Sequence, residues 1–195
     1  MDSLHLIELV LIVLAYLLGS VSSAIILSRL MGFTDPRTEG SNNPGATNVL
    51  RIAGKKAAIL TLLGDLLKGF IPVMIAYYFS ENIITLALVG LSAFLGHCYP
   101  LFFGFKGGKG VATAFGFIFA FNWIWGLIIF AIWLFIAKVL KISSLSAIIA
   151  FAVLPVLSWW HQENFQITLI LLVLSTILIW RHRSNIQRML IGQEK

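Results

Sequence analysis

Charged residues are scarce in this sequence. They make up 11% of its 195 residues, whereas soluble globular proteins carry about 25%, and hydrophobic residues make up 59%. With a mean hydropathy of +0.94, this composition excludes an ordinary soluble domain and indicates an all-α integral membrane protein. Acidic residues are rarer than basic ones: 8 Asp and Glu stand against 14 Lys and Arg, so the formal net charge is +6. Because little water-facing surface remains for those basic residues, we expect no nucleic-acid partner.

Cysteine, metal ligands and general bases are also scarce. The single Cys98 excludes an intramolecular disulfide framework and any CxxC motif. No His, Cys, Asp or Glu cluster has metal-ligand spacing, so we expect no metal and no cofactor. The sequence has no GxSxG elbow, and none of its four histidines forms the His-x4-Asp pair by which many acyltransferases activate a hydroxyl. An enzyme with so few bases needs a substrate that is already activated, and it works mainly by positioning and by stabilising a leaving anion.

Seven apolar stretches approach the roughly 20 residues that a membrane span requires. No Lys or Arg precedes Arg29, so the first stretch lacks the basic start of a cleavable signal peptide and we expect it to remain as a span. Asn122 is the one polar interruption between residues 110 and 137, so the fourth and fifth stretches could instead form one long helix. The predicted spans are 4–28, 56–79, 83–103, 109–121, 123–139, 144–160 and 164–181.

The basic residues decide between six and seven spans. Lysines lie on both sides of residues 110–137, and basic loops belong on the cytoplasmic side. An even number of crossings must therefore separate them, which predicts a turn at Asn122, seven transmembrane helices, an N-terminus outside and a cytoplasmic C-terminus. In this arrangement every Lys and Arg outside the spans is cytoplasmic: Arg29, Arg37, Arg51, Lys55, Lys56, Lys106, Lys109, Lys138, Lys141, Arg181, Arg183, Arg188 and Lys195. The acidic residues on or near the outer side are Asp2, Glu8, Glu81 and Glu163.

One ionisable pair, Asp65 and Lys68, lies inside a predicted span. The two residues are three positions apart and share a helix face. They form either a self-compensating pair that orients the helix or one wall of an inward-opening polar cavity. We find no repeat and no long linker, so residues 1–195 are predicted to form a single domain.

Three polar segments lie on the predicted cytoplasmic side. Residues 35–51 offer hydroxyls, amides and Arg51, a set that suits a phosphate monoester; Thr47 is expected to cap a short helix that ends before Gly54. The alternative is a well-capped connecting loop with positive-inside arginines.

Residues 104–110 combine four glycines with Lys106 and Lys109 at a helix start, a pattern typical of a phosphate cradle. This is not a Walker P-loop, because Phe103 and Gly110 stand where that motif has Gly and Ser or Thr. The alternative is a flexible basic loop.

The third segment, residues 181–188, is predicted to continue the last span as a surface helix. His182 and Asn185 share one of its faces and could hold a substrate hydroxyl or phosphate, or the helix could simply anchor the chain to anionic lipid. Ser144 and Ser146 lie at the start of the sixth span, at the same depth as these polar segments. They are either possible catalysts or hydroxyls that serve in packing. His97 is expected to be a packing or capping histidine.

Four groups of residues carry a longer pattern. They are Gly40-Ser-Asn-Asn-Pro-Gly-Ala-Thr-Asn48 with Arg51; Gly64-Asp-Leu-Leu-Lys-Gly69; Gly96-His97 with Phe105-Lys-Gly-Gly-Lys-Gly-Val-Ala-Thr113; and His182-Arg-Ser-Asn185 through Gly192-Gln-Glu194. In these motifs the chain resembles the bacterial acyl-phosphate:glycerol-3-phosphate acyltransferases from the first span to the last residues. One departure is Asn42, where the family more often has glycine.

The resemblance implies transfer of a fatty acyl group from acyl phosphate to the 1-hydroxyl of glycerol 3-phosphate. It also implies a multi-pass protein of the bacterial inner membrane, in contact with membrane lipid, with its active site facing the cytoplasm. The residues implied for acyl phosphate are Lys106, Gly107, Gly108, Lys109 and Gly110. Those implied for glycerol 3-phosphate are Ser41, Asn43, Arg51, His182 and Asn185. The implied catalytic set is Ser41, Arg51, Lys109, Ser144, His182 and Asn185, with Ser146 an alternative to Ser144.

Two other functions fit parts of the pattern. A transporter or channel for a small phosphorylated anion would need basic inner loops and an intramembrane Asp65–Lys68 pair. However, no predicted span has the paired Gly or Pro breaks near mid-depth that a central transport site often shows. A scaffold that binds anionic lipid would explain the arginines but not the two glycine-bearing loops.

Overall fold

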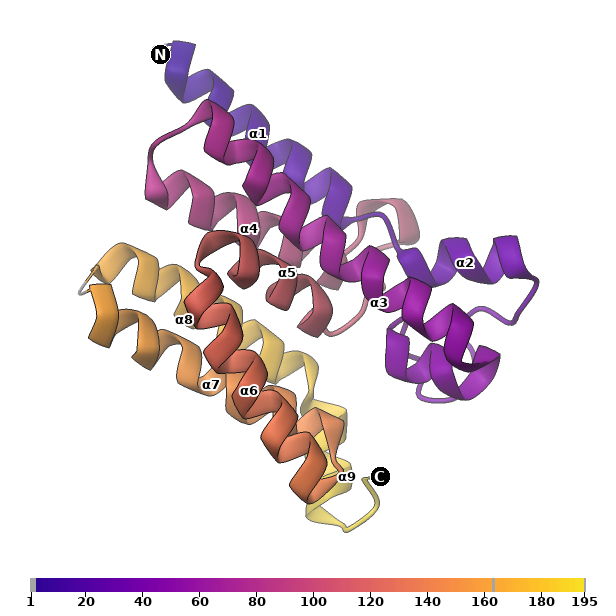
Figure 1. Ribbon diagram of the computed structural model, residues 1–195. Helices are drawn as coiled ribbons and strands as arrows, with labels where there is room; N and C mark the ends of the chain where they lie inside the picture. The colour runs from indigo at the N-terminus through magenta and orange to yellow at the C-terminus, as the bar shows by residue number, and fades with distance from the viewer. Residues whose placement is uncertain (1–2, 163, 195) are drawn as a thin grey trace. The chain divides into compact units, whose positions relative to one another are not determined.

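The computed structural model describes residues 3–162 and 164–194. Asp2, Glu163 and Lys195, which the charge argument included, lie outside these residues. The described chain is all-helical (Figure 1). Its elements are α1 (Ser3–Gly19), α2 (Ser23–Met31), α3 (Ala46–Phe79), α4 (Ile83–Cys98), the 3-10 helix η1 (Leu101–Phe103), α5 (Val111–Phe121), α6 (Trp123–Leu140), α7 (Ser143–Gln162), α8 (Phe165–Arg181) and α9 (Arg183–Leu190).

The helices have the length and composition of membrane spans. Within the described residues, four stretches are long and apolar enough to cross a membrane: Ala46–Phe79, Ile83–Phe103, Trp123–Leu140 and Ser143–His161. Two bent pairs, α1 with α2 and α8 with α9, raise the number to six if each pair is one span. Helix α5 has 11 residues, fewer than a straight span needs. The all-α integral membrane class is therefore confirmed, and the count of seven spans stays a prediction.

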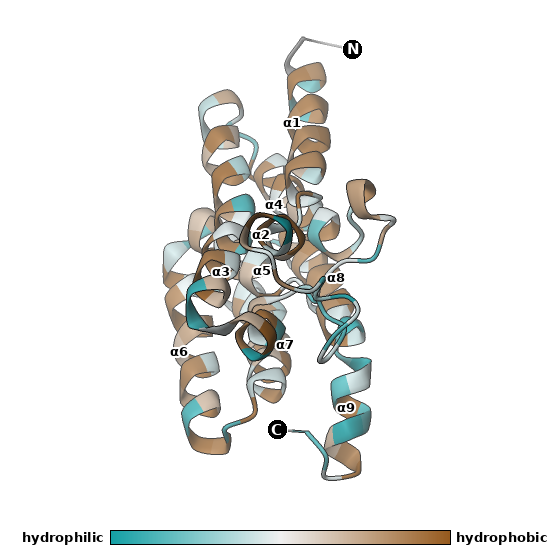
Figure 2. Cartoon of the chain, turned by 90° about the vertical axis from the view of Figure 1, so that its right-hand side faces the viewer, coloured by the Kyte–Doolittle hydropathy of each residue, from teal (hydrophilic) through white to brown (hydrophobic). Residues whose placement is uncertain are grey.

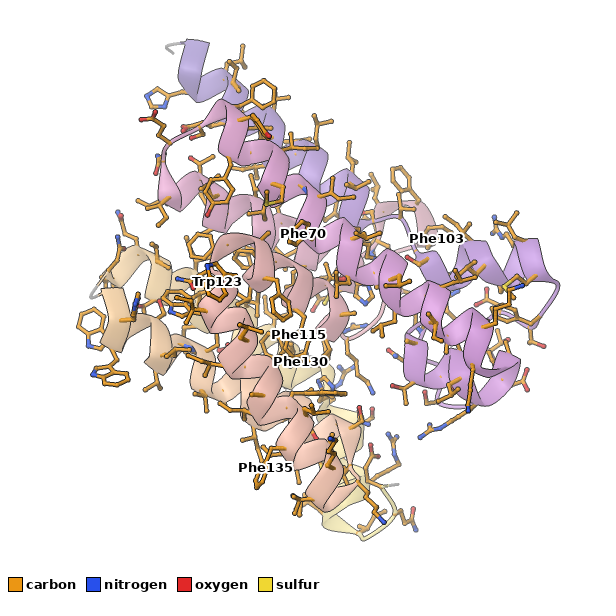
Figure 3. The ribbon with its side chains drawn as sticks, viewed as in Figure 1. Phe70, Phe103, Phe115, Trp123, Phe130 and Phe135 are labelled. Atoms are coloured by element: carbon orange, nitrogen blue, oxygen red, sulfur yellow. The ribbon has the colours of Figure 1, made fainter. Side chains whose placement is uncertain are left out.

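Many large apolar side chains face outward, as lipid-facing residues do. On α6, Trp123 is 64% exposed and Phe135 is 68% exposed (Figure 3). Figure 2 shows most helices in the brown of apolar residues and α9 largely in teal. An amphipathic α9 suits a membrane surface better than its interior.

The predicted first span, 4–28, is broken into two helices. Helix α1 ends at Gly19, and α2 begins at Ser23 with a bend of 40°. The intervening residues are rich in serine, and the Ser20 hydroxyl donates to the Tyr16 carbonyl oxygen at 2.9 Å, a competition that bends helices. The carbonyl of Val21 at this break accepts a hydrogen bond from Lys68 Nζ at 2.9 Å.

Two predicted helix breaks are confirmed. Asn122 is extended (φ −153°), and its side chain accepts from the Trp125 amide, so α5 and α6 are separate helices. Gly54 has φ 80° and ψ −176° and interrupts α3, a conformation essentially restricted to glycine. The predicted cap is wrong: α3 begins at Ala46 after the extended Gly45, and Thr47 lies inside the first turn.

The described chain divides after Phe121 into two compact units. In the first unit, α1 packs on α3 and α4, and α3 packs on α5. In the second unit, α7 packs on α6 and α8. The Ser175 hydroxyl on α8 donates to the Phe151 carbonyl oxygen on α7 at 2.7 Å, the kind of polar contact that joins helices in membranes.

Candidate functional site

Asn48 organises the loop between α2 and α3. Its side chain is buried; the amide nitrogen donates to the carbonyl oxygens of Pro36 (3.0 Å) and Glu39 (2.9 Å), and the amide oxygen accepts from the Ser41 backbone N–H (2.8 Å). The loop is thus folded around one side chain. Sequence reasoning quoted Asn48 within a motif and gave it no role.

The residues predicted for glycerol 3-phosphate in the first unit lie in this loop and in the helix that follows it. Ser41 and Asn43 are half-buried, and Arg51 is exposed on the first, short part of α3. Asn42 has φ 55°, in the left-handed region that asparagine tolerates better than most residues. Glycine adopts this conformation without steric cost, so the position suits glycine as well as asparagine.

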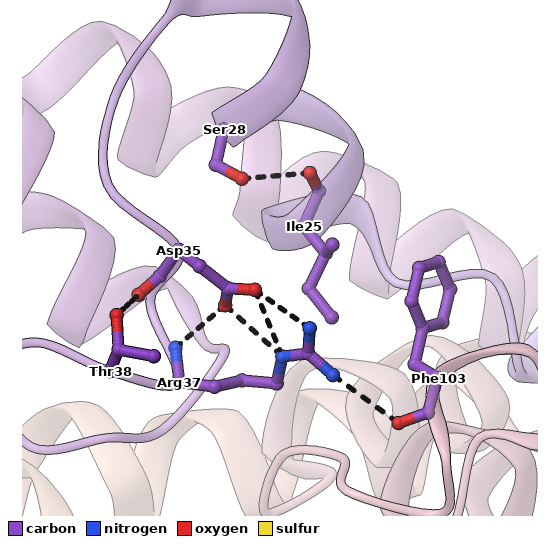
Figure 4. Close-up of polar contacts among 6 residues, drawn as sticks. All are labelled: Ile25, Ser28, Asp35, Arg37, Thr38 and Phe103. Atoms are coloured by element: carbon purple, nitrogen blue, oxygen red, sulfur yellow. Dashed lines mark hydrogen bonds and ion pairs between the residues drawn. The ribbon is translucent and has the colours of Figure 1, made fainter.

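Arg37 ties this loop to the start of the glycine-rich segment. Its guanidinium donates to the Asp35 carboxylate, with a shortest distance of 2.7 Å, and to the Phe103 carbonyl oxygen at 3.3 Å (Figure 4). The hydrogen bond from Arg37 is the main reason that the pKa of Asp35 lies below its ordinary value. The first unit therefore brings together two of the three predicted polar segments.

Three of the glycines in residues 104–110 are explained by close packing, whereas Gly104 has open space around it and a φ of 66°. A Cβ at Gly107 would overlap the His97 carbonyl oxygen, one at Gly108 would overlap the His97 ring, and one at Gly110 would overlap the Phe94 ring. The backbone amides of Lys106 and Gly108 donate to the carbonyl oxygens of Phe103 and His97. These two amides are therefore engaged within the protein. The positive charge of this segment lies on the lysine side chains, of which Lys106 is exposed and Lys109 is half-buried.

Ser144, Asn185 and Arg188 converge on Glu194 in the second unit. The Ser144 hydroxyl and the Asn185 amide nitrogen donate to Glu194 Oε1, the first at 2.7 Å, and Arg188 Nε donates to Oε2 at 2.7 Å. Ser146 is placed differently, because its hydroxyl donates to the Ile142 carbonyl oxygen at 2.8 Å. Sequence reasoning missed Glu194 as a site residue, although the Gly192-Gln-Glu194 run contained it.

His182 lies at the bend between α8 and α9. The two helices meet at 54°, so the surface helix predicted after the last span is present as α9 and is separated from α8 by a bend. His182 is buried, and its Nδ1 lies 2.8 Å from the Leu178 carbonyl oxygen. A carbonyl only accepts, so Nδ1 is the donor and Nε2 of the neutral ring is an acceptor. The Asn185 Oδ1 atom is buried with no hydrogen-bond partner among the described residues, so Asn185 brings an acceptor to the α8–α9 bend.

The Asp65–Lys68 pair is enclosed. Its side chains are 4% and 6% exposed, and Lys68 Nζ lies 2.9 Å from Asp65 Oδ1. This burial favours the self-compensating pair over the wall of an inward-opening cavity. No group of three or more His, Cys, Asp or Glu residues in 3–162 and 164–194 could hold a metal ion.

The fold and these segments define a class: a multi-helix membrane protein with basic and glycine-rich loops suited to anions. The sequence profile described as Glycerol-3-phosphate acyltransferase matches residues 9–192. The chain belongs to the glycerol-3-phosphate acyltransferase family.

Relatives and solved structures agree with this assignment. A glycerol-3-phosphate acyltransferase of Ruthia magnifica subsp. Calyptogena magnifica is 51% identical over 97% of this chain and 96% of the relative. A glycerol-3-phosphate acyltransferase of Hydrogenovibrio crunogenus (strain DSM 25203 / XCL-2) is 52% identical over 100% of this chain and 93% of the relative. Crystal structures of PlsY (YgiH), an integral membrane glycerol 3-phosphate acyltransferase, in its glycerol 3-phosphate and lysophosphatidic acid forms are 42% identical to this chain. They match with TM-scores of 0.91 and 0.87 and cover 96% of this chain and 94% of theirs.

Proposed function

We propose that this protein transfers a fatty acyl group from acyl phosphate to the 1-hydroxyl of glycerol 3-phosphate. The products are 1-acyl-glycerol 3-phosphate, which is lysophosphatidic acid, and inorganic phosphate, in an early step of phospholipid biosynthesis. The observation that carries the proposal is the match, over 96% of the chain, to a 42% identical enzyme solved with glycerol 3-phosphate and with lysophosphatidic acid.

In the first unit, the lysines and glycines of residues 106–110 are assigned to the acyl phosphate. Lys109 precedes the start of α5, where the helix dipole adds partial positive charge. Both charges stabilise inorganic phosphate as it departs. Ser41, Asn43 and Arg51 are assigned to the phosphate of glycerol 3-phosphate, for which a guanidinium and short polar side chains are suited.

In the second unit, His182 and Asn185 are assigned to the acceptor hydroxyl. The acceptors at the α8–α9 bend suit a hydroxyl donor, and Ser144 is held to Asn185 through Glu194. The proposal treats residues 1–195 as one acyltransferase domain.

The chemistry needs no protein base. Acyl phosphate is a mixed anhydride whose carbonyl carbon is already electrophilic. The hydroxyl oxygen attacks this carbon, the bond between carbon and phosphate oxygen breaks, and the hydroxyl proton passes to an oxygen of the leaving phosphate. Positioning and anion stabilisation then supply the rate enhancement, without a metal or cofactor.

The membrane arrangement is part of the proposal. We place the chain in the bacterial inner membrane with seven spans, an outer N-terminus, a cytoplasmic C-terminus and an active site that faces the cytoplasm. The positive-inside distribution of Lys and Arg supports this orientation.

The function is tested by incubating purified protein in detergent with palmitoyl phosphate and glycerol 3-phosphate. The expected result is formation of lysophosphatidic acid that depends on glycerol 3-phosphate, with release of phosphate that glycerol 3-phosphate accelerates. A transporter or a lipid-binding scaffold yields neither product, and that result would overturn the proposal.

Replacing Lys109 by alanine is expected to lower both acyl transfer and hydrolysis of palmitoyl phosphate in the absence of acceptor. Removing one group that stabilises a developing anion costs about 10²–10³ in kcat. The control is Lys138→Ala, which removes the same charge from an exposed position at the end of α6 and should leave both rates unchanged. Full transfer by the Lys109→Ala variant would refute the assigned phosphate site.

A further inference from the structure

His97 lies between a buried ion pair and the glycine-rich segment. It is the penultimate residue of α4 and is 7% exposed. Its Nδ1 atom lies 3.6 Å from Asp65 Oδ1, the same oxygen that pairs with Lys68 at 2.9 Å. None of these three residues has a part in the chemistry proposed above.

The ion pair gives His97 a fixed support. Charged side chains inside an apolar helix persist only when they are paired or bound to backbone carbonyls. Lys68 satisfies both conditions, because Nζ also donates to the Val21 carbonyl oxygen at the α1–α2 break. Asp65 is thereby held on α3 by a residue that is itself anchored to a second element, and the Asp65 carboxylate faces His97 on α4.

The opposite side of His97 supports Gly107 and Gly108. The Gly108 amide donates to the His97 carbonyl oxygen at 3.2 Å. A Cβ at Gly108 would overlap Nε2, Cε1 and Cδ2 of the His97 ring, whereas a Cβ at Gly107 would overlap backbone carbonyl oxygens of α4 and the Pro100 ring. The buried ring of His97 therefore packs directly against the backbone of Gly108, the residue before Lys109.

We infer that His97, oriented by Asp65 and Lys68, is a positioning residue that sets the place of Lys109 for the phosphate of the donor substrate. This inference rests on the proposed function. His97 acts through Gly108 and not on the reacting atoms. Loss of its ring should therefore raise KM for acyl phosphate while leaving KM for glycerol 3-phosphate unchanged, with a smaller change in kcat.

A double-mutant cycle tests the contact itself. Gly108→Ala alone places a methyl group where it overlaps the His97 ring, and this should raise KM for palmitoyl phosphate by about tenfold. A change of this size lies within the range of interaction energies measured between contacting residues. His97→Ala removes the ring, so in the double variant the new methyl group occupies the vacated space. The double variant should then have a lower KM than Gly108→Ala alone, a coupling of about fivefold or more.

Gly107→Ala is the matched control. Its methyl group meets backbone carbonyl oxygens, which truncation of His97 does not remove, so its effect should be equal in both backgrounds. His5→Gln, an exposed histidine on α1, should leave both KM values unchanged. If His97→Ala does not fold, His97→Asn keeps a polar nitrogen toward Asp65, lacks the far edge of the ring and serves in the same cycle.

The outcomes separate this inference from the proposed function. Equal effects of Gly108→Ala in both backgrounds, or equal rises in KM for both substrates, would refute the positioning role while the wild-type protein still made lysophosphatidic acid. The cycle is also measured without turnover, as the palmitoyl phosphate concentration that half-maximally protects the protein from thermal unfolding. If the wild-type protein made no lysophosphatidic acid but the double-mutant cycle for palmitoyl phosphate binding still showed coupling, only the proposed function would be refuted.

Discussion

Glu194 collects three donors, from Ser144 on α7 and from Asn185 and Arg188 on α9. Its side chain is 7% exposed, and burial alone raises the pKa of a carboxyl. The hydrogen bonds from these three side chains outweigh burial, so the pKa of Glu194 lies below its ordinary value of 4.5. A carboxyl whose pKa is lower in the folded than in the unfolded protein stabilises the fold at any pH above its unfolded pKa. This contribution to stability is lost as the pH falls through the folded-state pKa.

Replacing Glu194 by glutamine is expected to lower the free energy of unfolding at pH 7 by about 1–3 kcal/mol, the cost of losing charge-assisted hydrogen bonds. Wild-type protein should lose stability as the pH falls below 4.5, and the variant should lack the part of this loss that is due to Glu194. Thermal unfolding in detergent as a function of pH measures both effects. Glu81→Gln, an exposed change next to α4, should match the wild type. A Glu194→Gln variant with the wild-type profile would contradict the prediction.

In two helix pairs of the first unit, each helix contributes a glycine that lies against the backbone of the other helix. A Cβ at Gly69 of α3 would overlap the Thr113 carbonyl oxygen, and one at Gly116 of α5 would overlap the Leu66 carbonyl oxygen. Gly19 of α1 and Gly96 of α4 meet the partner backbone similarly. Small residues that allow backbones to touch are the usual means of helix association in membranes. The α3–α5 contact also places the N-terminus of α5, and with it Lys109.

Gly116→Ala should therefore destabilise the protein, although alanine favours an isolated helix over glycine by about 1 kcal/mol. The added methyl group has to displace backbone, and such overpacking costs about 1–3 kcal/mol or more. Gly64→Ala is the comparison, because its nearest neighbour is the Ser23 side chain, which can rotate. We expect a clearly lower Tm in detergent for Gly116→Ala than for Gly64→Ala. Equal Tm values would show that α3 and α5 can separate at no cost.

The whole molecule carries a net charge of +6, and the proposed orientation places all of this excess on one side of the membrane. Cysteine substitution can measure that placement, because the single native Cys98 is buried. Glu81 follows α3 and Lys141 follows α6, and both side chains are exposed. The proposed topology puts them on opposite sides.

In intact cells, a membrane-impermeant maleimide should label Glu81→Cys and should label Lys141→Cys only after permeabilisation. The physical reason is the cost of moving basic loops across the membrane during insertion. Wild-type protein, whose Cys98 is buried, is the background control. Labelling of Lys141→Cys from outside would reverse the proposed orientation and place the glycine-rich segment away from the cytoplasm.

Several features of the fold and site were predictable from sequence because they are local. The low charge and long apolar runs indicated membrane helices, and the breaks at Gly54 and Asn122 followed from the properties of those residues. The break at residues 19–22 was missed, because apolar residues continue on both sides of it and the Ser20 hydroxyl acts through a hydrogen bond to the preceding turn. The glycines of 107–110 were noticed correctly, but their cause, close packing on α4, was not visible.

The sequence by itself determined the membrane class, the chemical character of the polar loops and the family, since composition and ordered motifs are properties of the chain alone. The tertiary structure decided which of these residues act together. Ser144 and Glu194 are 50 positions apart, and Lys68 and Val21 are 47 apart, so no helical or strand period relates them. Hydrogen bonds and contacts between such distant residues depend on how helices pack, and packing follows from the fit of whole surfaces.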